Sequence, residues 1–268
     1  MDTLTQYKQI VARLQARGDD IVETYLATAL APASARLYRA AILRLVPLSP
    51  INKERLYQHT FRPTKKRGTS LRVKRFSIPD TEALARELIV RQRRDAAIWL
   101  LATVAVGLRP CEWACAHLDE HLLHVKNAKN TDGRSFGETR SLIVESEATR
   151  RIVSLQLAQV VMRPDWKTLH KSCYAAVHRA ARALWPSRLK LPGIYTGRHT
   201  FCASAKVHFS RIEVAALMGH GSIESASRHY APRWSGARGR GVRPSAHDID
   251  SVRNRNAHSD INPTTPSP

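Results

Sequence analysis

The sequence predicts a mainly α-helical protein with a small antiparallel β-sheet, divided into two domains. Apolar residues recur at helical spacing through most of the 268 residues. One pair of segments instead alternates in the manner of strands, and an Asp-Gly dipeptide typical of a hairpin turn separates the two. A basic stretch with a proline and a glycine interrupts these patterns, and we expect it to be the linker between the domains.

The first domain, residues 1–61, is expected to be a small helical domain. Helical spacing predicts four helices, over residues 4–18, 19–30, 34–46 and 52–61. Gly18 ends the first of them. The third has alanine and leucine on one side and three arginines on the other. A domain of this kind would present one basic face.

Residues 62–76 are expected to form a basic linker. Pro63 and Gly68 break any regular element there, and the segment contains no acidic residue. A solvated loop is one interpretation, but the charge density favours a strap that lies along the phosphates of a polyanion. The expected DNA contacts are Arg62, Lys65, Lys66, Arg67, Arg72, Lys74 and Arg75.

The second domain, residues 77–234, begins with two predicted helices between residues 77 and 108. Ser77 or Asp80 is the expected N-cap, and Gly107 is the expected stop. Pro110 predicts a further helix over residues 110–118, because proline is tolerated in the first turn. Arg109 would then lie in a tight turn between two helices.

A hairpin and three more helices complete the second domain. The strands are expected over residues 121–129 and 140–144, with Asp132-Gly133 in the turn between them. The helices are expected over residues 165–185, 197–209 and 211–219. Gly219 is a natural C-cap that would leave His220 exposed in a turn. Residues 235–268 are rich in Gly, Arg, Asn, Ser and Pro, and we expect a disordered tail there.

Charge indicates the class of partner. The chain has 43 Lys and Arg against 22 Asp and Glu, a formal net charge of +21, which points to a polyanion and first to nucleic acid. An anionic membrane surface is the weaker alternative, because no segment pairs a basic face with a strongly apolar one. The longest apolar run, residues 96–108, is shorter than the roughly 20 residues that cross a bilayer.

The four cysteines do not form a spaced framework, which favours a reduced, cytosolic chain without a signal peptide. Cys111 and Cys115 would share a helix face, and we interpret them as small hydrophobic residues and not as a zinc site. The sequence has no phosphate-binding G-x-x-x-x-G-K-[ST] loop.

Four side chains suit chemistry at a phosphate. Arg109 and Arg198 lie at a turn and at a helix start, where their planar guanidinium groups could clamp phosphoryl oxygens. His220 could donate a hydrogen bond to the same anion. Tyr230 lies in the polar segment "SASRHY", unlike a packing tyrosine, and an unbroken helix would carry it about 15 Å from His220. His220 and Tyr230 can meet at one phosphate only if the chain bends between them or the helix that carries Tyr230 moves. Alternatively, Tyr230 acts in the site of a neighbouring subunit.

These segments carry a resemblance to the tyrosine recombinases of the phage-integrase family. "VAVGLRPCEW" resembles the first arginine box of the family, in which Glu112 would support Arg109. "YTGRHTFCASA" resembles the second box, and "LMGHGSIESASRHY" resembles the Gly-His turn followed by the nucleophile. "VKNAKNTDGRSFGETRSLIV" resembles the hairpin with the catalytic lysine, for which Lys129 is the better match and Lys126 the lesser.

The resemblance covers roughly residues 77–234, and more loosely the N-terminal helices, which are similar to a core-DNA-binding domain. It implies a site-specific recombinase or integrase that needs neither metal nor ATP. The implied catalytic residues are Tyr230, Arg109, Arg198, Lys129 and His220. Tyr230 would form a 3′-phosphotyrosine link, and Lys129 would protonate the leaving 5′ oxygen. It also implies double-stranded DNA as partner, a homotetramer on DNA, and a bacterial or phage-encoded protein of the cytoplasm and nucleoid.

One position departs from the family. Its second box usually begins with His or Lys, and here that residue is Tyr195. A phenol can donate a hydrogen bond but is a poor acid or base at neutral pH, given a reference pKa of about 10. His199, next to Arg198, is expected either to support the site or to pack. Proton removal from Tyr230 is left to water, to His220 or to a pKa of Tyr230 lowered by the arginines.

Three alternatives stay open at this point. The first is a catalytically impaired DNA-binding protein on the same scaffold, which Tyr195 favours slightly. The second is an unrelated helix-turn-helix regulator, which would need neither Lys129 in a hairpin nor an exposed Tyr230. The third is a type IB topoisomerase, which shares the chemistry but would relax supercoils without sequence preference.

Overall fold

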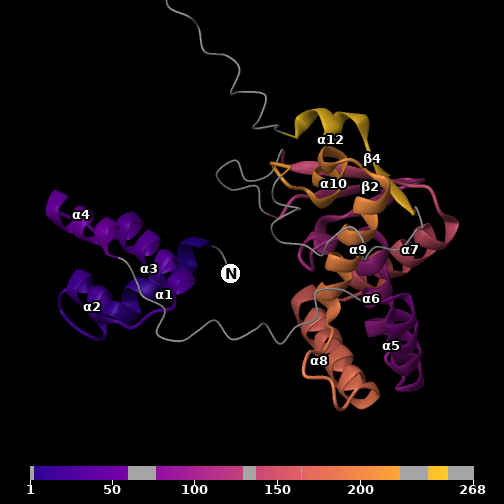
Figure 1. Cartoon of the computed structure of the whole chain (residues 1–268), viewed down its shortest axis with the longest axis horizontal. Helices are drawn as coiled ribbons and strands as arrows, with labels where there is room; N and C mark the ends of the chain where they lie inside the picture. Colours follow the sequence, from indigo (N-terminus) through magenta and orange to yellow (C-terminus); the bar gives the residue numbers. More distant parts are fainter. Residues whose placement is uncertain (1–2, 60–76, 129–136, 164, 224–240, 253–268) are drawn as a thin grey trace, which may run out of the picture. The chain divides into compact units, whose positions relative to one another are not determined.

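The computed structural model describes residues 3–59, 77–128, 137–163, 165–223 and 241–252. The chain divides into two compact units, Met1–Thr69 and Ser70–Pro268, whose elements are labelled in Figure 1. The linker predicted over residues 62–76 lies outside the described residues, so its bounds stay a prediction. In the described part of the chain, no helix is long and apolar enough to cross a membrane.

The first unit contains the four helices that the sequence predicts. They are α1 (Thr3–Gln15), α2 (Ile21–Ala27), α3 (Pro32–Leu45) and α4 (Pro50–Gln58). The side chain of Asp20 caps α2, and that of Ser49 caps α4 before a proline at its first position. Tyr25 packs in the core and donates its hydroxyl to the Ala35 carbonyl at 3.0 Å. The core residues are Ile10, Leu14, Val22, Tyr25, Ala41, Ile42 and Leu56.

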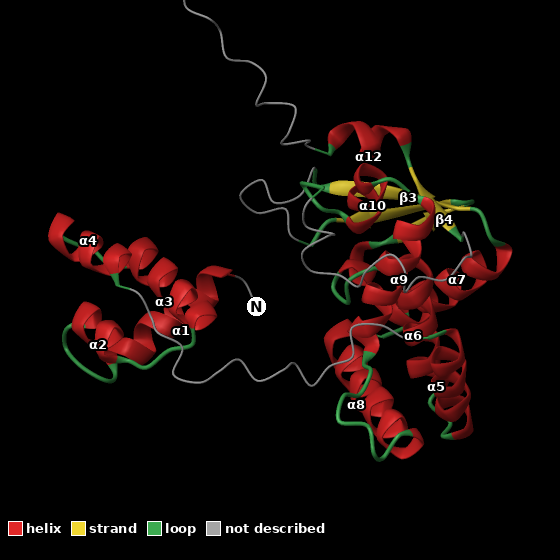
Figure 2. Cartoon of the chain, viewed as in Figure 1, coloured by secondary structure: helices red, strands yellow, loops and turns green. Residues whose placement is uncertain are grey.

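The second unit combines helices with one sheet. Its helices are α5 (Ile78–Val90), α6 (Arg94–Val106), α7 (Glu147–Val161), α8 (Trp166–Leu184), α9 (Ile194–His208), α10 (Arg211–Met218) and α12 (Ala246–Ser251), with a 3₁₀ turn η1 (Glu112–Cys115). Ser77 is the N-cap of α5, and Gly107 ends α6 with a left-handed backbone, as predicted. In Figure 2 the sheet lies beside α10 and α12 at one end of this unit, while α5 and α8 lie at the other.

The sheet is antiparallel throughout, in the order β1-β2-β3-β4. Its strands are β1 (His117–Asp119), β2 (Leu122–Lys126), β3 (Thr139–Val144) and β4 (Val242–Pro244). The predicted hairpin is the β2–β3 pair, in which Val125 lies opposite Arg140. Alternate residues of both strands face the core, because successive strand side chains point to opposite faces. Arg140, Leu142 and Val144 are therefore buried in a row.

The structure of this unit differs from the sequence analysis in two wrong predictions and one missed helix. The helix expected over residues 110–118 is only the η1 turn, because Glu112 folds back onto the Arg109 amide and His117–Asp119 pairs with β2. Helix α7 was not predicted, although its N-cap Ser146 and acidic first turn are typical start signals. The disordered tail expected over residues 235–268 is wrong for residues 241–252. There β4 extends the sheet and α12 packs on α10 through Val252.

Candidate active site

Glu112 is the centre of a buried group of charges. Its side chain is fully buried and accepts hydrogen bonds from Arg109 Nη1 at 2.6 Å and from Arg140 Nη2 at 2.8 Å. Arg198 Nη1 lies 3.7 Å from the same carboxylate. We call Arg109, Glu112, Arg140 and Arg198 the Glu112 cluster. It joins the two arginines that the sequence predicted to act together, from parts of the chain nearly ninety residues apart.

Arg109 is placed by a short turn closed from both directions. The Glu112 amide donates to the Arg109 carbonyl at 2.9 Å, and the Arg109 amide donates to Glu112 Oε2 at 2.8 Å. The Arg109 side chain is 9% exposed, and its buried Nε finds no acceptor among the described residues. A buried donor without an acceptor is costly in free energy.

Arg198 lies near the start of α9, where that helix crosses α6. Gly197 allows the crossing, because a Cβ there would lie 3.1 Å from Val104 Cγ2 and 3.2 Å from the Val104 nitrogen. Arg198 therefore reaches the end of α6 and donates Nη1 to the Gly107 carbonyl. It also donates Nη2 to the Met218 carbonyl at 2.6 Å. Arg198 is fully buried and connects the ends of α6 and α10.

His220 follows the C-cap of α10, but it is not exposed as the sequence predicted. It is 7% exposed, because the helix ends against the Glu112 cluster and not in solvent. Gly219 has φ +62°, and a Cβ there would lie 2.5 Å from Asn127 Oδ1 and 2.7 Å from Arg140 Nη1. Glycine is needed at this position both for the left-handed backbone and for the close approach.

Arg140 and Asn127 belong to the site, and the sequence analysis missed both. Arg140 is 1% exposed and Asn127 is 5% exposed, and Arg140 Nη1 donates to Asn127 Oδ1 at 2.5 Å. The signal for Arg140 was available, since strict alternation with Leu142 and Val144 puts it on the apolar face of β3. A charged residue on that face needs a buried partner. Which partner it takes could not be predicted, because Glu112 belongs to a distant segment.

The cluster carries an excess of two positive charges, since three arginines share one carboxylate. Burial alone would raise the pKa of Glu112, but the charges of Arg140, Arg198 and Arg109 outweigh it and hold that pKa well below the usual range. Burial, followed by the charge of Arg198, lowers the pKa of His220 to about 2. His220 is therefore a neutral imidazole at physiological pH. An added anion would relieve the positive excess.

Other predicted site residues do not enter the cluster or cannot be placed. Tyr195 is 40% exposed and makes an edge-to-face contact with His199 on the next turn of α9, with ring centroids 5.5 Å apart. Lys129 and Tyr230 lie outside the described residues. So do the basic residues Arg62, Lys65, Lys66, Arg67, Arg72, Lys74 and Arg75. The roles predicted for all of these remain predictions, although Ala128, directly before Lys129, donates its amide to Glu112 Oε1 at 3.4 Å.

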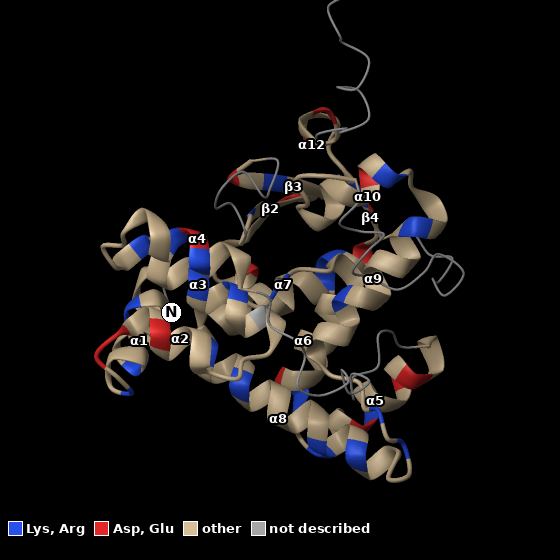
Figure 3. Cartoon of the chain, turned by 60° about the vertical axis from the view of Figure 1, so that its left-hand side comes forward, with Lys and Arg blue, Asp and Glu red and all other residues tan. Residues whose placement is uncertain are grey.

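Positive charge also gathers on helix α8 of the same unit. Figure 3 shows Lys and Arg along α8, and this helix contains no acidic residue. Helix α8 carries Lys167, Lys171, Arg179 and Arg182. A surface of this kind attracts a polyanion, and the attraction weakens as salt is added.

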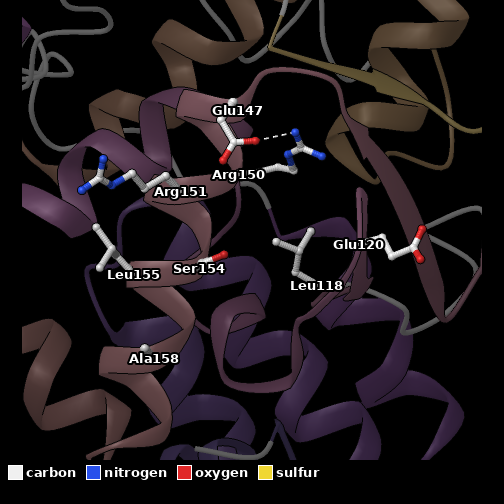
Figure 4. A pocket seen from close by; sticks show the side chains of 8 residues that line it. All are labelled: Leu118, Glu120, Glu147, Arg150, Arg151, Ser154, Leu155 and Ala158. Atoms are coloured by element: carbon white, nitrogen blue, oxygen red, sulfur yellow. Dashed lines mark hydrogen bonds and ion pairs between the residues drawn. The ribbon is translucent and has the colours of Figure 1, made fainter.

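A separate cavity of about 650 Å³ lies between β1 and α7. Figure 4 shows its lining, in which Arg150 pairs with Glu147 at 2.5 Å and Leu118 lies opposite Leu155 and Ser154. No member of the Glu112 cluster lines it. In the described ranges, no three His, Cys, Asp or Glu side chains lie close enough together to hold a metal ion.

Comparisons with known proteins identify solved structures with a similar fold. No family model matches the chain, and no curated protein matches its sequence. Among solved structures, it is similar to a lambda integrase tetramer bound to a Holliday junction, with a TM-score of 0.59 and 13% identity over 86% of this chain and 72% of that one. A lambda integrase dimer bound to a core site has a TM-score of 0.51 and 13% sequence identity, over 85% of this chain and 65% of that one. The XerH site-specific recombinase bound to a palindromic difH substrate has a TM-score of 0.50 and 14% sequence identity, over 85% of this chain and 72% of that one. The chain therefore has the two-domain, mainly helical fold of the tyrosine recombinases.

Proposed function

We propose that this protein is a site-specific DNA recombinase that cleaves and rejoins strands through a 3′-phosphotyrosine intermediate. The observation that carries the proposal is the buried excess of positive charge formed by Arg109, Arg198 and Arg140 around Glu112. Such a site favours a phosphodiester whose negative charge grows in the transition state. The basic helix α8 supports double-stranded DNA as the source of that phosphodiester.

Each step of the proposed reaction balances without a cofactor. The Tyr230 oxygen attacks phosphorus and releases its proton to water, while the bond from phosphorus to the 5′ oxygen breaks. Lys129 gives a proton to that oxygen, which leaves as a hydroxyl. The 5′ hydroxyl of another strand then attacks the phosphotyrosine and releases Tyr230. The number of phosphodiester bonds is unchanged, so no external energy source is required.

The arginines and His220 have distinct roles in this scheme. Arg109 and Arg198 donate to the oxygens of the transferring phosphoryl group, for which the planar guanidinium is suited. His220 takes part as a neutral hydrogen-bonding group, because its pKa of about 2 excludes a resident positive charge before DNA binds. Its low pKa also makes it a weak base. The positive excess near the site instead favours ionisation of the Tyr230 phenol.

Assembly follows from the chemistry. Exchange between two duplexes requires four strand cleavages, so we expect four copies of the chain to act together on two DNA sites. Integration, excision and resolution share this scheme and differ in the DNA that is presented.

Covalent trapping tests the proposal. DNA fragments from either side of the gene are first selected by binding to the purified protein, and nicked duplexes of the bound fragments are then incubated with it. A nick close to the cleaved phosphate lets a short strand diffuse away, so the protein stays attached. We expect an SDS-resistant adduct with the wild-type protein and none with Tyr230→Phe. Specific binding without any adduct would contradict the proposal and favour the catalytically impaired alternative.

A further inference from the structure

A basic pocket lies between the end of α5, the start of α6 and the middle of α8. It has a volume of about 350 Å³ and is lined by Arg91, Arg93, Ala176 and Arg179. None of these residues belongs to the Glu112 cluster, and α5 and α8 lie at the opposite end of the unit from the sheet in Figure 2. Three of the lining side chains are arginines and none is acidic, so the pocket suits an anion.

Arg93 is held in place at the start of α6. Its Nε and Nη2 donate to the two oxygens of Asp95, each at 3.0 Å, and Nη2 also donates to Ser172 Oγ of α8 at 2.9 Å. Arg93 therefore spans from α6 to α8 before any ligand binds. Its Nη1 has no acceptor in the described part of the chain, which leaves this donor for a ligand.

The turn that joins α5 to α6 brings Arg91 to the same pocket. Gln92 has φ +56°, a left-handed conformation that few non-glycine residues adopt and that often marks a functional position. The Arg93 amide closes the turn by donating to the Leu88 carbonyl at 2.8 Å. Arg91 donates Nε to Glu87 at 2.5 Å, and both of its terminal nitrogens lack an acceptor among the described residues. Arg91 can therefore bind an anion without leaving Glu87.

Arg179 supplies a positive charge that no acidic side chain neutralises. It is an exposed residue of α8, and within the described ranges it forms no hydrogen bond or ion pair. Lys171 and Arg182 are about three helical turns apart on α8 and share one exposed face. Arg179 precedes Arg182 by just under one turn, so it lies beside that basic face, on the side of the pocket.

We propose that this pocket binds a phosphate group of the DNA backbone other than the one that is cleaved. Guanidinium groups from three separate elements suit the tetrahedral oxygens of a phosphate. The inference rests on the proposed function for the identity of its ligand, and it goes beyond that function by assigning a DNA contact outside the Glu112 cluster. Contacts to phosphates fix the register of a protein on a duplex. The pocket therefore helps to align the DNA while the cleaved phosphate lies in the Glu112 cluster.

Arg179→Gln and Arg91→Gln test the pocket. Glutamine keeps a polar side chain but removes one positive charge, and both arginines are exposed, so neither change breaks a buried contact. Arg86→Gln is the matched control. Arg86 and Arg91 each pair with the glutamate four residues earlier in α5, but only Arg91 lines the pocket. The control thus loses the same charge and an equivalent surface pair.

Equilibrium binding of a short duplex is measured at several salt concentrations. Each phosphate that a protein neutralises adds about 0.9 to the slope of the logarithm of the binding constant against that of the salt concentration. We expect Arg179→Gln to reduce this slope by about 0.9 and to weaken binding roughly tenfold. Because Arg91 and Arg179 would share one phosphate, the double variant should lose little more than Arg179→Gln alone. Arg86→Gln should keep the wild-type slope.

Single methylphosphonate substitutions identify the phosphate that is bound. Each removes the charge of one phosphate, and the substitutions are placed in turn along both strands of the DNA fragment selected for covalent trapping. We expect one position, separate from the cleaved bond, at which the substitution weakens binding by the wild-type protein and by Arg86→Gln. At that position it should not weaken binding by Arg179→Gln any further, since the contact is already lost.

The outcomes separate this inference from the proposed function. If Arg179→Gln and Arg91→Gln bind DNA with the affinity and salt slope of Arg86→Gln, the pocket holds no DNA phosphate, while an adduct on Tyr230 would still support the proposed function. If the variants lose the contact but the wild-type protein forms no adduct, the pocket stands and the proposed function fails. Coupling of Arg179 to the cleaved phosphate would also overturn the inference. Thermal unfolding checks that each variant is folded.

Discussion

Arg140 Nη2 donates to Glu112 Oε2 at 2.8 Å, and both side chains are at most 1% exposed. This pair links β3 to the first arginine turn across 28 residues of sequence. Its burial means that neither charge can be solvated by water if the other is lost. The candidate site is therefore also a centre of stability for the second unit.

Glu112→Gln should destabilise the protein strongly. The amide keeps the shape of the carboxylate but leaves three guanidinium groups without a counter-charge. We expect a loss of about 3–5 kcal/mol in the free energy of unfolding, the usual cost of breaking a buried pair. Glu145→Gln is the control, since its exposed pair with Arg243 should be worth less than about 1 kcal/mol. Urea unfolding at pH 7 measures both, and similar small losses would argue against a buried charge centre.

Stability should fall as the pH drops below about 6.5, because of His220. The unfolded chain binds a proton to this histidine near pH 6.5, whereas the folded protein resists it down to a pKa of about 2. The unfolded state thus binds more protons in this window, and one histidine contributes about 1.4 kcal/mol per pH unit below pH 6. His220→Asn should remove this slope between pH 6 and 5, whereas His247→Asn, at an exposed position, should not. A wild-type slope unaltered by His220→Asn would refute the assignment.

Gly219→Ala should lower both stability and cleavage. The left-handed backbone and the 2.5 Å approach to Asn127 Oδ1 oppose any side chain at this position. We expect a loss of at least about 1 kcal/mol from the backbone alone, and slower cleavage because His220 and the hairpin base shift together. Gly137→Ala is the matched change, since a Cβ there would meet only the Thr139 carbonyl at 3.7 Å. Equal behaviour of the two variants would contradict the close packing described for Gly219.

Asp248→Ala should weaken the attachment of the C-terminal strand and helix. Asp248 is 4% exposed and accepts the Ser141 amide of β3 at 2.7 Å. Without it that part-buried amide loses its charged partner, at a cost of about 1–3 kcal/mol. Asp250→Ala, on the exposed side of the same helix, should change little. Proteolysis within the segment that contains β4 and α12 should become faster in Asp248→Ala only. An unchanged rate of proteolysis would argue that Asp248 does not hold this segment on β3.

Local signals predicted the parts of the fold that depend on neighbouring residues. Ser77, Gly107 and Gly219 begin or end helices as their caps indicate, because capping depends on a few adjacent backbone groups. The hairpin was predicted from the alternation of apolar and polar residues along its two strands. The short strands β1 and β4 did not, since three residues carry almost no periodic pattern and their pairing depends on distant strands.

The sequence predicted three residues of the Glu112 cluster but not the fourth, Arg140, and not the environment of the cluster. The motifs named Arg109, Arg198 and Glu112, which the structure brings together. They did not reveal that His220 is buried or that Arg140 shares Glu112. Burial depends on how α10 packs against β2 and β3, and a polar side chain carries no sequence mark of the neighbours that will cover it.

The central claim is that Tyr230 becomes bonded to a DNA phosphate. The trapped complex can be digested with nuclease and protease, and the peptide that carries the remaining nucleotide can be sequenced by mass spectrometry. The account predicts one modified peptide, with a 3′-phosphonucleotide on Tyr230. A nucleotide attached to any other residue, or through its 5′ phosphate, would contradict it.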